Sequence, residues 1–376
     1  MKRKVIPVIC LLAILQWHCV QTYVSPYKSP TTGYLVVEGY INGSGPSGFT
    51  LSRTASLSGD SAIPMVTGAQ LQVEGSDNST WPIAELGNGN YILPSITLNT
   101  GTQYRLRISN VGGEEYLSDY VPFKATPPID SINWVRNDAG VTIYANTHDP
   151  AGATRYYQWK YTETWQYTSS EQSGLIWDPV KDTVFYRPPD QQIYNCWHID
   201  SSSQILLGTS EKLAQDVIFE QPLISIGANT QPLGIVYTVI VSQFALTQPA
   251  FQYYTAMQKN TESLGSIFDA QPTQLTGNIH STSNAAEPVI GFVSAGTVQQ
   301  ERIYITNRQL PNWFYSFMCE FPDRKIPPIK DSLIKYFTNE DYTPITFDLN
   351  VLVGNLTTCI DCRAQGGTNI KPPYMP

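Results

Sequence analysis

Aromatic side chains recur at every second position between residues 157 and 167. The row consists of Tyr157, Trp159, Tyr161, Trp165 and Tyr167, and only Glu163 interrupts it. Because alternate side chains of a strand point to opposite faces, this period predicts one long strand of about eleven residues. An aromatic face of this kind is most often buried in a core, with Trp159 as the anchor. The alternative is an exposed face that stacks on sugars or docks a partner.

Shorter alternating runs fill the rest of the chain. In residues 104–109, apolar Tyr104, Leu106 and Ile108 alternate with polar residues, which is typical of a half-buried strand. Such runs follow one another at close spacing with glycine- and asparagine-rich turns between them. Residues 34–126 are therefore predicted to form an antiparallel sandwich of about seven strands, similar in size to an immunoglobulin- or transthyretin-like domain.

A second domain is expected after Pro127 and Pro128, which favour an extended link. We predict that it spans residues 129–306 and contains a helix near residues 249–263, where apolar residues recur at steps of three and four. Residues 307–376 are proline-rich and weakly periodic, and they predict an irregular cap. The fold class is thus mainly β, with two tandem sandwich domains, one short helix and this cap.

The N-terminus has the features of an export signal. Lys2, Arg3 and Lys4 precede the apolar residues 5–15, a run too short to span a bilayer. Cys19 follows at the position where a lipoprotein signal is cut and the cysteine acylated, which predicts a signal at residues 1–18 and a tether at residues 19–33. The alternative is a plain secreted protein, because bulky side chains fill residues 16–18.

Charge limits the possible partners. Residues 1–18 contain three of the 23 basic residues and none of the 31 acidic ones, so the remaining chain has a net charge of −11. This balance disfavours nucleic acid and electrostatic adhesion to anionic lipid. We expect contact with a membrane through the N-terminal lipid alone.

Catalytic and metal-binding motifs are missing from the sequence. Outside the signal there are three histidines, His148, His198 and His280, and they do not have zinc-site spacing. No nucleophile elbow or Walker loop occurs. No cofactor, metal or catalytic residue is therefore assigned. A hydrolase whose fold brings two carboxylates together is a remaining alternative.

Four cysteines remain after the signal and Cys19: Cys196, Cys319, Cys359 and Cys362. An even number in an exported chain predicts two disulfides that pin the C-terminal cap. Their pairing cannot be derived from the sequence. A redox site or a zinc site at the C-x-x-C of residues 359–362 is the alternative.

Several stretches together resemble one known family over the whole mature chain. They are residues 127–132, 156–165, 196–197, 265–269, 272, 277–278, 289–292, 359–363, 366–367 and 371–372. In order and spacing they look like the domain-of-unknown-function 4249 family of Bacteroidota lipoproteins. The resemblance implies an outer-membrane or cell-envelope lipoprotein, commonly encoded beside a TonB-dependent transporter. It supplies no catalytic or binding residues.

These observations give three functional hypotheses. The first is a non-enzymatic accessory or ligand-capture lipoprotein of a TonB-dependent transporter, lipid-anchored in the outer membrane. The second is a stand-alone lipoprotein that binds carbohydrate or peptide through exposed aromatic residues, and the third is the hydrolase. The sequence identifies neither the small-molecule, glycan or peptide ligand nor the side of the membrane.

Overall fold

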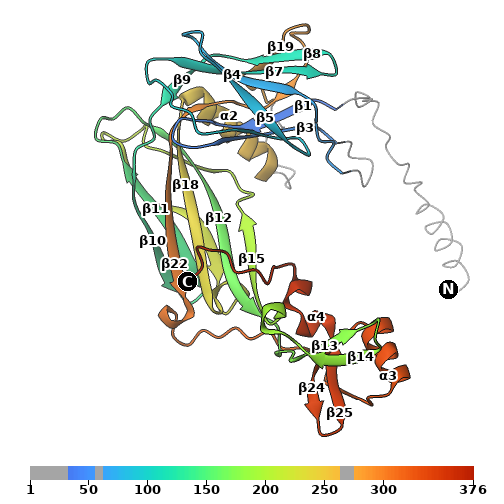
Figure 1. The fold of residues 1–376 in the computed structure, drawn as a ribbon. Helices are drawn as coiled ribbons and strands as arrows, with labels where there is room; N and C mark the ends of the chain where they lie inside the picture. Colours follow the sequence, from blue (N-terminus) through green and yellow to red (C-terminus); the bar gives the residue numbers. More distant parts are fainter. Residues whose placement is uncertain (1–32, 56–61, 263–274) are drawn as a thin grey trace, which may run out of the picture.

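The computed structural model describes residues 33–55, 62–262 and 275–376 (Figure 1). The predicted signal at residues 1–18, Cys19 and all but residue 33 of the predicted tether lie outside these residues. Within the described part, the fold is mainly β. No helix of that part has the length and apolar character needed to cross a membrane.

Nine N-terminal strands form the first domain. They are β1 (Leu35–Gly39), β2 (Ile41–Asn42), β3 (Ser47–Arg53), β4 (Gln70–Gly75), β5 (Thr80–Gly87), β6 (Asn90–Leu93), β7 (Gln103–Val111), β8 (Glu114–Ser118) and β9 (Val121–Lys124). On β7, Tyr104, Leu106 and Ile108 are buried as their alternation predicts. They belong to one apolar core that unites these strands.

Three short strands from much later in the chain complete this domain. β19 (Ile279–Ser281) pairs with β8, β20 (Val289–Ile290) pairs parallel with β1, and β21 (Ala295–Gly296) lies between β2 and β9. All three strands lie within residues 129–306, which were predicted to form the second domain. The structure places them in the first domain, because each segment pairs with the free edge of a strand that is remote in sequence.

Two sheets face each other in the second domain. One contains β10 (Ile129–Asn137), β11 (Gly140–His148) and β17 (Val217–Gly227). The other contains β15 (Asn195–Ser201), β12 (Tyr156–Thr168), β18 (Val236–Leu246) and β22 (Val298–Thr306), and β16 (Leu206–Thr209) also pairs with β12. Side chains from both sheets form a single apolar core.

The predicted long strand is β12, which has 13 residues. Trp159, near the start of this strand, is fully buried, and its Nε1 donates a hydrogen bond to Gln243 Oε1 at 2.9 Å. The predicted helix is α2 (Gln248–Glu262), which lies where the first-domain strands approach β12 and β18 (Figure 1). Residue 263, the predicted last residue of this helix, lies outside the described residues.

The C-terminal region is more regular than predicted. It contains β23 (Arg324–Ile326), α3 (Lys330–Ile334), β24 (Tyr342–Asp348), β25 (Val351–Leu356) and α4 (Thr357–Ile360), and its three strands form one sheet. The hairpin of β13 (Leu175–Asp178) and β14 (Thr183–Tyr186) packs on it, so a separate lobe forms (Figure 1). Leu175 shares a core with Ile326 and Leu352, and this remote contact explains why the local sequence predicts only an irregular cap.

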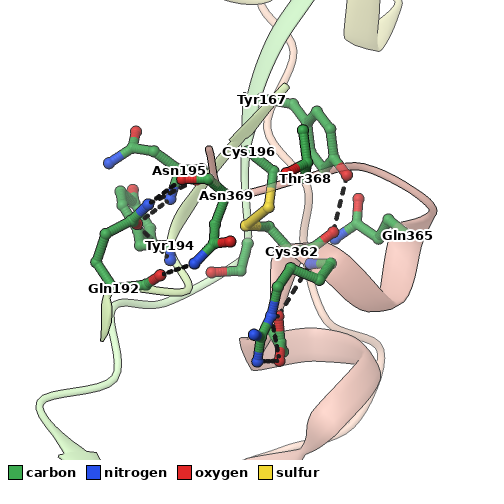
Figure 2. The surroundings of a disulfide bond; sticks show 12 residues. Tyr167, Gln192, Tyr194, Asn195, Cys196, Cys362, Gln365, Thr368 and Asn369 are labelled. Carbon is green, nitrogen blue, oxygen red and sulfur yellow. Dashed lines mark hydrogen bonds and ion pairs between the residues drawn. A yellow bond between two sulfur atoms is a disulfide. The ribbon is translucent and has the colours of Figure 1, made fainter. Parts of the chain in front are cut away.

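One disulfide joins the C-terminal region to β15 of the second domain, and a second disulfide lies within the C-terminal region. Cys196 pairs with Cys362, and Cys319 pairs with Cys359, so neighbouring members of the C-x-x-C belong to different bridges. Figure 2 shows the first bridge, beside which Tyr167 Oη donates to the Cys362 carbonyl at 2.8 Å.

Candidate functional site

The aromatic row of β12 is mainly core. Tyr157, Trp159, Trp165 and Tyr167 are at most 9% exposed, and Tyr161 is partly buried. Their polar atoms bind inside the protein, since Tyr157 Oη donates to Asp216 Oδ2 at 3.0 Å and Trp165 Nε1 donates to the Gln231 side chain at 3.2 Å. Stacking on an extended ligand therefore requires other aromatic side chains.

The three histidines lie apart from one another. His148 contacts Asp130 at 2.8 Å, His198 stacks on Trp165 with ring centroids 4.5 Å apart, and His280 lies 3.5 Å from Asp119. Hydrogen bonding to Asp130 raises the pKa of the His148 imidazole. In residues 33–55, 62–262 and 275–376, no three His, Cys, Asp or Glu side chains gather in a way that could hold a metal ion.

A cavity of about 350 Å³ lies between the first domain, α2 and the second domain, and we call it the inter-domain cavity. Residues 36–40 and 290–292 line one side of it, and β12, β18, α2 and residues 202–205 line the others. The aromatic side chains that line it are those of Tyr40, Phe244, Tyr253, Tyr254 and Phe292. Ligand sites occur preferentially at such domain junctions and combine apolar walls with a few polar groups.

The polar groups of the inter-domain cavity are diverse. Glu38 and Lys160 supply one charge of each sign, and both side chains are exposed. Tyr254 Oη donates to the Phe292 carbonyl at 3.3 Å, and Tyr40 Oη donates to the Thr297 carbonyl at 3.4 Å. Burial raises the pKa of both tyrosines, so both phenols stay neutral hydrogen-bond donors.

Tyr253 has an unused hydroxyl. Its side chain is 5% exposed, and its Oη makes no hydrogen bond that satisfies normal geometry within the described residues. Burial raises the pKa of Tyr253 to about 12, and the nearby backbone amide of Gly291 partly offsets that rise. A buried hydroxyl without a partner costs free energy, but this oxygen has almost no accessible surface, so a ligand can accept a hydrogen bond from it only after the Tyr253 side chain turns toward a cavity.

A second cavity of about 610 Å³ lies on the other side of Tyr253 and Phe292. Asp119, Tyr120 and Asn278 of the first domain line it together with Gln252 of α2. Tyr253 and Phe292 thus separate two cavities that both lie between α2 and the first domain. A change at either side chain would alter both.

Two glycines allow the backbone segments beside these cavities to pack closely against each other. A Cβ on Gly277 would lie 1.8 Å from the Gly291 carbonyl oxygen, and a Cβ on Gly291 would lie 2.3 Å from the Val37 carbonyl oxygen. Asn278 fixes the same wall, because its side chain accepts from Val293 N at 2.8 Å and donates to Val293 O at 2.9 Å. The backbone around the site is therefore tightly fitted.

Sequence reasoning did not find this site. Its residues come from remote segments, and no local period marks them. One signal was present, because residues 277–278, 289–292 and 156–165, which carry the family resemblance, contribute to the walls of the two cavities. Residues 265–269 and Pro272, which also carry it, lie outside the described residues.

Comparisons with known proteins agree with the resemblance. A family model described as a domain of unknown function, DUF4249, matches residues 21–302, which include both cavities. A search of curated proteins finds no match. One solved structure found is a marsupial T cell receptor, which is 11% identical; the alignment covers 58% of this chain and 94% of that one, at a TM-score of 0.15. A score that low gives no basis for comparing the two folds.

Proposed function

The chain belongs to the DUF4249 family, and from this premise we propose that it is a non-enzymatic ligand-capture lipoprotein serving a TonB-dependent transporter. In this proposal Cys19 carries the lipid that holds the protein in the outer membrane. The two β domains, each a sandwich, then stand on a short tether. The inter-domain cavity receives a small ligand that the transporter imports.

The inter-domain cavity is the observation that supports ligand capture. Its volume of about 350 Å³ is within the range for small-molecule sites. Aromatic side chains offer flat apolar faces, and the exposed side chains of Lys160 and Glu38 offer a hydrogen-bond donor and an acceptor. This combination suits a ligand that has both an apolar face and hydroxyl or carbonyl acceptors, such as a short glycan or a small peptide.

The lining of the inter-domain cavity supports binding more than catalysis. Among the described residues that line it there is neither histidine nor cysteine, and Glu38 is the one carboxylate. General acid–base hydrolysis of a glycoside needs a second carboxylate at the scissile bond. Glu163 and Asp200, which face each other on β12 and β15, lie outside this lining.

The transporter partnership can be tested by affinity capture. Tagged protein is solubilised from native membranes of its own host, and the co-purifying proteins are identified by mass spectrometry. We expect recovery of a TonB-dependent transporter in stoichiometric amount. Recovery of the tagged protein alone, from membranes that contain such transporters, would contradict the partnership.

Lipidation can be tested in the same cells. Metabolic labelling with an alkyne-tagged fatty acid should mark the protein, and Cys19→Ala should remove the label and release the protein from the membrane. Protease digestion of intact cells then distinguishes the cell surface from the periplasmic face. An unlabelled wild-type protein would refute the lipid anchor.

Ligand capture can be tested separately by calorimetric titration with a panel of oligosaccharides and dipeptides. Ser203→Trp places a bulky ring at the mouth of the inter-domain cavity and should abolish binding of any compound that the wild type binds. Ser201→Trp is the matched control, because Ser201 is exposed but does not line the cavity. Equal loss in both variants would argue against this site.

A further inference from the structure

Glu163 occupies the one position of the inward row of β12 that is not aromatic. Tyr161 and Glu163 are the two members of that row that are only partly buried, while the other four are buried. Glu163 therefore lies in the second domain at a place where the two sheets do not pack tightly. This site is separate from the inter-domain cavity.

The space beside Glu163 is a cavity of about 630 Å³, and we call it the inter-sheet cavity. Tyr161 and Glu163 line it from β12, and Leu206 lines it from β16. The opposite wall consists of residues 222–227 of β17, together with Thr230 and Pro232. The side chains of that wall are mainly apolar, but polar atoms contribute more than half of the exposed surface of the cavity, so a charge inside it is only partly desolvated.

Glu163 has one hydrogen-bond donor and no cation. Tyr237, which is fully buried, donates from Oη to Glu163 Oε2 at 2.7 Å. Among the described residues, Oε1 accepts no hydrogen bond and no Lys or Arg pairs with the carboxylate. Carboxylates with restricted access to water are normally paired, so this one has an unused capacity for a positive partner.

The surrounding charges also favour a cation. Asp200 lies directly opposite Glu163 on β15 and adds negative potential, whereas His198 on the same strand adds a weaker positive one. Within the described part of the chain, Tyr161 and Tyr237 are the other titratable groups near Glu163, and the lining from β16, β17 and the loop after it contains none. Burial raises the pKa of the Glu163 carboxyl, Asp200 raises it further, and the Tyr237 hydrogen bond lowers it.

We propose that the inter-sheet cavity is a second binding site, which takes an organic cation with Glu163 as its counter-ion. The ligand is a primary ammonium or guanidinium group on an apolar stem. The stem packs on Leu206 and the apolar residues of β17, and the charged group reaches Glu163 Oε1. The Tyr161 ring offers a face for cation–π contact. Such a group occurs on free amines and on lysine or arginine side chains of peptides.

Binding at this site should depend on pH. Because the pKa of Glu163 is raised, part of the empty protein carries a protonated carboxyl in mildly acidic solution. The cation binds the ionised form, so binding releases a proton. Affinity should therefore rise as the pH increases through the raised pKa and become constant above it.

The test is calorimetric titration of the full-length protein in detergent with defined probes. Butylammonium and agmatine represent free amines, and capped Ala-Lys-Ala represents a peptide. Butanol and the same peptide with acetyl-lysine are the neutral counterparts. Saturable binding of a cationic probe but not of its neutral counterpart supports the proposal. Binding of the amines alone identifies a free amine as the ligand, and binding of the peptide alone identifies a side chain.

Glu163→Gln should weaken cation binding at least about tenfold and abolish its pH dependence, because the amide keeps the Tyr237 hydrogen bond but loses the charge. Glu38→Gln, in the inter-domain cavity, is the matched control and should bind the cation normally. Tyr237→Phe, a second variant, should move the pH midpoint of binding upward. The proposal is overturned if no cationic probe binds saturably, or if Glu163→Gln binds as the wild type does. Neither result bears on ligand capture between the domains.

Discussion

Replacing Gln243 with leucine should destabilise the protein strongly, because this side chain is fully buried and joins β12, β11 and the link before the second domain. Its Oε1 accepts from Trp159 Nε1 at 2.9 Å, and its Nε2 donates to the Pro127 carbonyl at 2.9 Å and to Thr147 Oγ1 at 3.0 Å. Thr147 retains a partner, since its hydroxyl donates to the Pro128 carbonyl. Leucine therefore leaves two buried polar groups unsatisfied, the Trp159 indole N–H and the Pro127 carbonyl.

Each unsatisfied buried group costs about 1–3 kcal/mol, so Gln243→Leu should lower the free energy of unfolding by roughly 3 kcal/mol. Urea denaturation followed by circular dichroism measures this loss. Gln300→Leu is the matched control, because Gln300 on the neighbouring strand is exposed, and it should change the stability by less than about 0.5 kcal/mol.

A double-mutant cycle tests the reason for the loss. Trp159→Phe removes the indole N–H, so Gln243→Leu should cost about 1 kcal/mol less in that background than in the wild type. Strict additivity of the two changes, or a loss under about 1 kcal/mol for Gln243→Leu alone, would refute the argument that orphaned polar groups set the cost.

Three further predictions concern the bridge, the cavity wall and pH. Joint replacement of Cys196 and Cys362 by serine removes a bridge across 166 residues and should cost up to about 5 kcal/mol, measured as a lower melting temperature under otherwise identical conditions. Gly291→Ala should destabilise the protein and reduce its soluble yield, because the added Cβ would lie 2.3 Å from a carbonyl oxygen of β1. An unchanged melting temperature would contradict this close packing of the two backbone segments. His148 should titrate above its ordinary pKa in an NMR titration, and Asp130→Asn should restore that value. Because the folded-state pKa is raised, this pair stabilises the fold fully below about pH 6.5 and loses its effect as pH rises through the raised pKa.

Local periodicity predicted the parts of the fold that depend on neighbouring residues. The alternation in β7 and β12 placed Tyr104 and Trp159 in cores, and the three- and four-residue steps predicted α2 to within one residue at its start. These patterns work because a strand or helix that is buried on one face must repeat its apolar residues at its own period.

Local periodicity could not predict which strands pair when they are remote in sequence. β20 has two residues, and nothing in Val289 and Ile290 themselves indicates that they pair with Leu35 and Val36. The inter-domain cavity depends on that pairing, so the site could not be assembled from the sequence. The sequence did mark Glu163 as an interruption of the aromatic row, but it gave no sign of the cavity beside it.

The return of β19, β20 and β21 to the first domain sets the order in which the protein can be completed. During synthesis the N-terminal strands emerge first, yet their sheets gain their last members only when residue 296 has emerged. Until then β1, β2, β8 and β9 expose unpaired backbone groups, which is a hazard for aggregation. A fragment that stops at residue 126 should therefore remain open at these strands, and the shortest piece able to close the first domain includes most of the second.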